Sequence, residues 1–161
     1  LQLQGRWDEA RSRYAASLKL RPAPLTRYSL GVAQRETGHL ADALASFRLF
    51  LAETQSTVTL PYVPPAQTAL AELRMEVGRL ALVVGPRPME GLTLTLDGEA
   101  MEQAPLRDID PGAHEIIARA PGFQEGSARF VARAAALSSP WFCCRRRTSP
   151  STADGIRTAC A

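Results

Sequence analysis

Apolar residues in the first half of the chain recur at the spacing of one helix face. Segments 6–20 and 39–51 each carry a small residue, an aromatic residue four positions on and a leucine four further. Residues four apart lie on the same side of a helix, so both segments are predicted to be helices that bury this face. The two sets are Ala10, Tyr14 and Leu18, and Ala43, Phe47 and Leu51.

Two more helices are predicted beside these segments. Residues 25–37 form the first, and Gly38 follows it at a place where helices commonly end. Residues 65–79 form the second, with Pro65 in its first turn, where a proline is tolerated. The apolar stripe of the first helix consists of Leu25, Tyr28 and Val32.

After Gly78 the apolar period becomes that of strands. Leucine and threonine alternate in residues 92–96, so one face of this strand is predicted to pack on a core. Asp97-Gly98 and Pro111-Gly112 predict tight turns of an antiparallel sheet. The predicted strands are 80–84, 92–96, 113–118 and 128–131, and the predicted core is Leu106, Ile109, Ile116 and Phe123.

These elements predict an α+β fold in three parts. Residues 1–79 are expected to form helical hairpins with a capping helix, and residues 80–133 a small antiparallel β-domain. Residues 134–161 lack apolar periodicity and are expected to be disordered. One hypothesis is that the coding frame is lost near Arg133, which would leave an unpaired sheet edge after Val131.

The tail holds all three cysteines, Cys143, Cys144 and Cys160. Their spacing does not match a zinc site, and an odd number gives no complete set of disulfides. The cysteines therefore give little support to the interpretation of the chain as a metal or redox protein. An alternative for the tail is a lipid-modified segment that touches a membrane through Arg145, Arg146 and Arg147.

Charge is distributed unevenly, although the whole chain of 161 residues carries a net charge of only +3. Residues 61–130 carry six basic and ten acidic side chains, which argues against nucleic-acid binding by the β-domain. The sequence contains no apolar run of about 20 residues and no signal-peptide pattern at its start. Because the sequence opens at Leu1, we expect it to be a fragment, with more helical repeats upstream.

The helical half resembles the tetratricopeptide repeat family. The earlier copy of the motif is carried by Gly5, Ala10, Tyr14 and Pro22, and the later copy by Leu30-Gly31, Gly38, Ala43 and Phe47. The resemblance covers about 50 residues and implies stacked helical hairpins that present a groove to a protein or peptide partner. It makes Tyr28 and Arg35, on the inner helix of the groove, the candidate binding residues.

Residues 78–131 resemble the PEGA domain, a small β module. Four motifs occur in the family's order: Leu96-Asp97-Gly98, Ala104-Pro105-Leu106, Ile109-Asp110-Pro111-Gly112-Ala113-His114 and Gly122-Phe123. At the motif that names the family the chain has Pro88-Met89-Glu90-Gly91-Leu92, with an inserted Met and a Leu in place of Ala. The resemblance implies a non-enzymatic module in a bacterial envelope or exported setting.

Four polar residues invite a catalytic or ligand-binding interpretation. His114 follows a turn and is expected to be a hydrogen-bonded structural residue, and His39 is expected to face solvent. Asp108 and Asp110 lack the glycine and distal glutamate of a calcium loop, so a solvated turn is expected. We expect no catalytic residue, cofactor or metal.

Two functional classes remain. The first is a non-enzymatic interaction or scaffold protein whose helical repeats bind a protein or peptide, while the β-domain docks at the cell envelope or in the periplasm. The second is the regulatory or sensory tail of a larger signalling enzyme, such as a protein kinase, whose catalytic part lies upstream. The sequence leaves two questions open. One is whether parts of the protein beyond this sequence associate with a membrane or the cell envelope, and the other is the oligomeric state.

Overall fold

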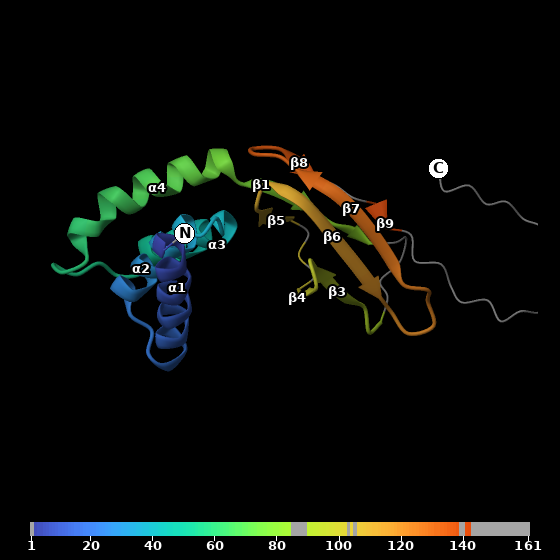
Figure 1. Ribbon diagram of the computed structural model, residues 1–161, viewed down its shortest axis with the longest axis horizontal. Helices are drawn as coiled ribbons and strands as arrows, with labels where there is room; N and C mark the ends of the chain where they lie inside the picture. Colours follow the sequence, from blue (N-terminus) through green and yellow to red (C-terminus); the bar gives the residue numbers. More distant parts are fainter. Residues whose placement is uncertain (1, 85–89, 103, 105, 139–140, 143–161) are drawn as a thin grey trace, which may run out of the picture.

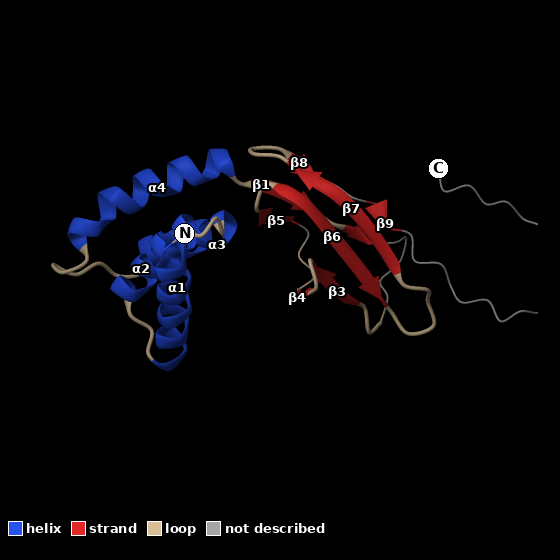
Figure 2. Cartoon of the chain, in the orientation of Figure 1, coloured by secondary structure: helices blue, strands red, loops and turns tan. Residues whose placement is uncertain are grey.

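The computed structural model describes residues 2–84, 90–102, 104, 106–138 and 141–142. Helices occupy its first half (Figure 1) and strands its second (Figure 2), which confirms the predicted α+β class. The helices are α1 (Gln2–Leu20), α2 (Pro24–Glu36), α3 (Leu40–Ala52) and α4 (Val63–Glu76), with a 3-10 turn at Leu60–Tyr62. The strands are β1 (Gly78–Ala81), β2 (Val83–Val84), β3 (Thr93–Leu96), β4 (Glu99–Met101), β5 (Leu106–Ile109), β6 (Gly112–Arg119), β7 (Gly126–Ala132), β8 (Leu137–Ser138) and β9 (Trp141–Phe142).

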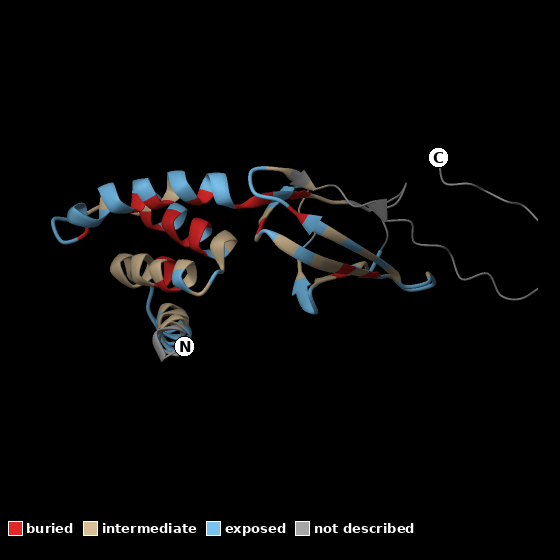
Figure 3. Ribbon diagram, turned by 45° about the horizontal axis from the view of Figure 1, so that its top comes forward, coloured by how far each residue is buried: buried red, intermediate tan, exposed pale blue. Residues whose placement is uncertain are grey.

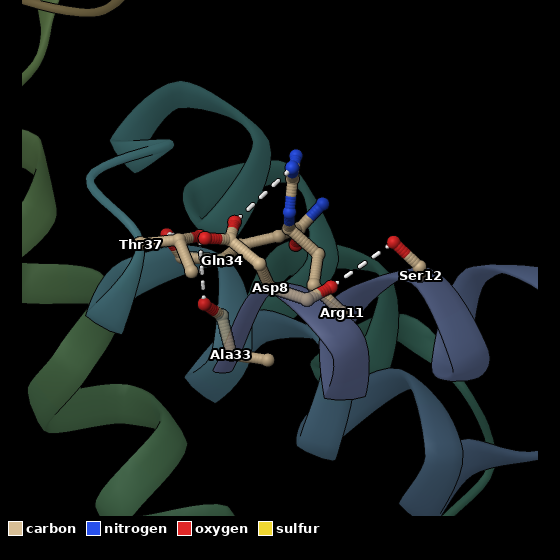
Figure 4. Close-up of polar contacts among 6 residues, drawn as sticks. All are labelled: Asp8, Arg11, Ser12, Ala33, Gln34 and Thr37. Carbon is tan, nitrogen blue, oxygen red and sulfur yellow. Dashed lines mark hydrogen bonds and ion pairs between the residues drawn. The ribbon is translucent and has the colours of Figure 1, made fainter. Parts of the chain in front are cut away.

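Helices α2 and α3 form an antiparallel hairpin with defined ends. Pro24 begins α2, where its missing N–H costs no helical hydrogen bond. At the other end the Thr37 hydroxyl donates to the carbonyl of Ala33 at 2.9 Å (Figure 4). Gly38 then turns the chain with φ +80°, a conformation that glycine adopts without steric cost. The predicted stop at Gly38 is therefore confirmed.

The helical core lies mainly between α3 and its neighbours. Phe47 and Phe50 of α3 are fully buried, as is Leu73 of α4, and the buried positions gather where α3 and α4 face each other (Figure 3). On the α2 side, a Cβ added at Gly31 would lie 3.1 Å from the Phe47 ring, so the absence of a side chain there lets the two helices approach closely. Within the described region, no helix combines the length and apolar character needed to cross a membrane.

The helical half passes into the β half without a linker. Helix α4 ends at Glu76, Val77 is buried and extended, and β1 begins at Gly78. The helix predicted over residues 65–79 therefore ends earlier than expected, at Glu76. Gly78 lets the Arg133 carbonyl oxygen approach the start of β1 closely, because a Cβ there would lie 2.8 Å from this oxygen.

The strands form three small sheets around one core. The largest is antiparallel with the order β4-β3-β6-β7, and β1 pairs antiparallel with β5. The core contains Ile109 and Ile116 as predicted, together with Leu80 and Leu94. The predicted core residue Leu106 is wrong, since it is 53% exposed. It stands three positions before Ile109 on β5, and residues an odd number apart point to opposite faces of a strand.

Residues 134–142 correct the prediction of a tail that is disordered from residue 134. Strand β8 pairs in parallel with β1, and β9 pairs in parallel with β2, so these sheets are not purely antiparallel as predicted. Strands of two residues are too short to show a period in the sequence, which is why the prediction missed them. The three cysteines, the arginine run 145–147 and residues 85–89, which include Pro88 and Met89, lie outside the described residues.

Phe47→Ala is expected to lower the free energy of unfolding by about 3–5 kcal/mol, because it leaves a cavity in the helical core. Leu49→Ala on the same helix is the matched control: Phe47 is 1% exposed and Leu49 52% exposed. Urea unfolding followed by circular dichroism measures both. Equal losses for the two variants would contradict this core assignment.

A chain ending at Arg133 is expected to be less stable than one ending at Phe142. Besides the pairing of β8 with β1, the shorter chain loses two backbone hydrogen bonds that join residues 135–136 to residues 77–79: Arg79 N–H to Ala136 O at 2.8 Å and Ala135 N–H to Val77 O at 3.1 Å. At about 1 kcal/mol each, these cost about 2 kcal/mol of unfolding free energy. Thermal and urea unfolding of the two chains give the difference, and indistinguishable stabilities would argue that β8 adds nothing.

Candidate functional site

The first turn of α3 meets the turn between β5 and β6. The amide of Ala41 donates to a carboxylate oxygen of Asp110 at 2.6 Å. The first amides of a helix have no partner within the helix, and the residue preceding α3, His39, makes no side-chain cap. Asp110 therefore supplies from the β half the acceptor that an N-cap side chain would otherwise provide, and its negative charge suits a helix N-terminus.

A second polar contact joins the same two elements. Arg48 of α3 pairs with Asp108 of β5, with 2.7 Å between Nη1 and Oδ2. The arginine side chain is 45% exposed, so the pair contributes at most about 1 kcal/mol to stability. Its main effect is geometric, because two separate contacts along α3 restrain rotation of the helix relative to the strand.

His114, near the start of β6, contacts the turn that carries Asp110. Its Nδ1 lies 2.6 Å from Oδ2 of Asp97, and its Nε2 lies 2.8 Å from the backbone carbonyl oxygen of Asp110. The imidazole is only 12% exposed and packs against Phe130 of β7, with 5.7 Å between ring centroids. This confirms the expectation of a hydrogen-bonded structural histidine.

Asp97 holds the other side of His114. It has φ +52° and Gly98 has φ +86°, so the Asp-Gly pair forms the tight turn with positive φ that the sequence predicts. The Asp97 carboxylate accepts both from His114 and from the Glu115 amide, the latter at 2.8 Å. Burial alone would raise the pKa of Asp97, but the Glu115 hydrogen bond and the bond and charge of His114 outweigh it and lower this pKa.

These residues border a cleft of about 290 Å³ between the two halves. Carboxylates dominate its lining, and three of them, Asp97, Asp108 and Asp110, are engaged in the contacts above. Among the described residues, no three metal-ligating side chains are grouped in a way that could hold an ion. The cleft is thus a hydrogen-bonded joint between the two halves. Its polar lining is His39, Asp42, Asp97, Glu99, Arg107, Asp108, Asp110 and His114.

The sequence-predicted binding residues Tyr28 and Arg35 lie on α2, away from this joint. The Tyr28 ring packs edge-on against Phe47 and Phe50 at centroid distances of 5.6 and 5.4 Å. Arg35 pairs with Glu72 of α4 at 2.7 Å, and its side chain is 37% exposed. Both residues therefore have internal partners, and their role in a groove stays a prediction.

Sequence reasoning missed the contacts that Asp108, Asp110 and His39 make at the joint. The expectation of a solvated turn at Asp108 and Asp110 is wrong, because both carboxylates contact α3. His39, expected to face solvent, is half-buried at the start of α3 and lines the cleft. No local signal marks these contacts, since Ala41 and Asp110 are 69 positions apart.

Comparison with models of known protein families gives no match to this chain, and comparison with curated proteins gives none either. The functional proposal therefore rests on the contacts of this chain and on the resemblances carried by its own residues.

Asp97→Asn is expected to lower stability by about 1 kcal/mol at neutral pH, because the asparagine keeps the shape and tolerates positive φ but removes a charged acceptor. The Asp97 pKa is lowered on folding, so its carboxylate stabilises the fold above the ordinary pKa of about 3.9. This contribution is lost as the pH falls through the lowered pKa. Urea unfolding between pH 7 and pH 2 should show the two chains converging in acid, whereas a constant difference would contradict the assignment.

Proposed function

We propose that this chain is a non-enzymatic interaction or scaffold protein. Its helical half binds a protein or peptide partner, and its β half docks at the bacterial cell envelope. The observation that carries the proposal is the joint between the halves, where α4 runs into β1 through buried Val77 and Asp110 binds the first turn of α3. A protein that links two partners benefits from holding its two binding units in one orientation.

The architecture of the joint supports this reading. Units that move independently are usually joined by exposed, polar linkers with few contacts between them. Here the connection is a single buried residue, and two polar contacts cross the interface. The carboxylates of Asp110 and Asp108 are used in these two contacts, as expected where a joint is held in one orientation.

The α2 side of the helical half offers the surface for a partner. Tyr28 contacts Tyr62 with 5.1 Å between ring centroids, and Tyr62 is 39% exposed. Val58, in the loop before the 3-10 turn, and Leu60, in that turn, are also exposed. Aromatic and aliphatic side chains beside an arginine are typical of protein-binding surfaces, where Tyr and Arg frequently dominate the binding energy. The predicted binding residue Tyr28 borders this surface through its contact with Tyr62, and Arg35 lies seven positions further along α2.

Arg35→Gln is expected to weaken binding of a protein partner about tenfold or more, as loss of an interface arginine commonly does. The matched control is Glu72→Gln, which breaks the same 2.7 Å ion pair and leaves Arg35 in place. A partner is first captured by photo-cross-linking from position 60, and the affinities of the purified pair are then measured by calorimetry.

The two variants share any loss of stability that comes from the broken pair. Weaker binding by Arg35→Gln alone therefore assigns the contact to the arginine itself. Equal affinities for wild type and Arg35→Gln would remove Arg35 from the binding surface. Failure to cross-link any partner from position 60, with successful capture from exposed Leu49 on α3, would place the binding surface elsewhere.

A further inference from the structure

Both ring nitrogens of His114 face atoms that can only accept hydrogen bonds. Nδ1 lies 2.6 Å from a carboxylate oxygen of Asp97, and Nε2 lies 2.8 Å from the carbonyl oxygen of Asp110. A neutral imidazole carries one N–H, whereas the imidazolium carries two. Only the protonated ring therefore satisfies both contacts. In the neutral ring, one nitrogen lone pair points at an oxygen lone pair.

The same aspartate connects His114 to the helical half. The backbone carbonyl of Asp110 faces His114, and its side-chain carboxylate accepts the amide of Ala41 in α3. The carbonyl and the carboxylate belong to one residue in a short turn, so a shift of the carbonyl away from the imidazole also shifts the carboxylate. Gly112, two positions on, has φ +146°, a conformation that other residues rarely adopt, so the turn has one defined shape.

We propose that His114 is the proton-sensitive element of a latch between the two halves of the chain: the protonated ring holds the β5–β6 turn against α3, and loss of its second proton releases Asp110 from the Ala41 amide. The latch is closed when the ring carries both protons and open when it carries one. The inference goes beyond partner binding and rests on the joint alone.

Other charged groups face the same site from each element packed around it. The Asp97 carboxylate comes from the turn after β3, and the Arg129 and Glu115 side chains pair across β6 and β7 at 2.9 Å. From α3 and its N-terminus come Asp42 and His39, and from β4 and β5 come Glu99, Arg107 and Asp108. Histidine is the side chain that ordinarily changes charge near neutral pH, so His39 must be separated from His114 by experiment.

The test follows the Ala41 amide of the whole chain by NMR across about pH 5 to 8. The hydrogen-exchange protection of this amide, corrected for its intrinsic rate, is compared with the ring signals of both histidines. Protection is expected to fall about tenfold as His114 loses its second proton, the change for one charge-assisted hydrogen bond. The chain has two histidines, so each can be removed in turn.

His39→Gln is expected to keep the pH-dependent change at Ala41, because His114 is then the sole histidine. His114→Gln is expected to abolish it. Loss of the change in His39→Gln, or its persistence in His114→Gln, would overturn the latch, as would an Ala41 amide whose protection is constant over the range in the wild type. If His114→Gln fails to fold, the wild-type and His39→Gln titrations decide.

Discussion

The first turn of α3 needs hydrogen-bond acceptors for its amides, and this need is met from the other half of the chain. Asp110 accepts from Ala41 at 2.6 Å, where no side chain of the preceding residue caps the helix. The position of Asp110 depends in turn on His114, which is itself held by Asp97. A hairpin turn, a histidine and a helix end thus form one continuous polar chain across the joint.

These polar contacts connect the helical half of the chain to the β half. The helical core around Phe47 and the β core around Ile116 are separate apolar clusters. Neither cluster contains residues of both halves, so neither fixes the angle between them. Buried Val77 and the contacts of Asp110 and Arg48 supply that restraint. The proposed scaffold role would use this fixed arrangement. The proposed control by a proton would act on the polar contacts of the joint, which are more sensitive to charge than apolar packing.

Local sequence patterns predict the structure correctly where one residue type strongly favours one backbone conformation. Gly38 and the Asp97-Gly98 pair adopt positive φ at the predicted turns. The helix and strand periods located the four main helices and strands β3, β6 and β7. The sequence patterns did not predict the short strands β4, β5, β8 and β9. Leu106 was assigned to the core by its hydrophobicity, although the pleat of β5 turns it outward.

The sequence by itself determined the order of the helices and longer strands, the tight turns and part of the two apolar cores, because these depend on the conformational preferences and periods of neighbouring residues. The tertiary structure alone decided that Asp110 caps α3, that Asp108 pairs with Arg48 and that β8 completes the sheet beside β1. These contacts join residues about 60 positions apart in the chain. A carboxylate in a turn has the same local pattern whether it faces water or a helix end, and only folding brings the helix end to it.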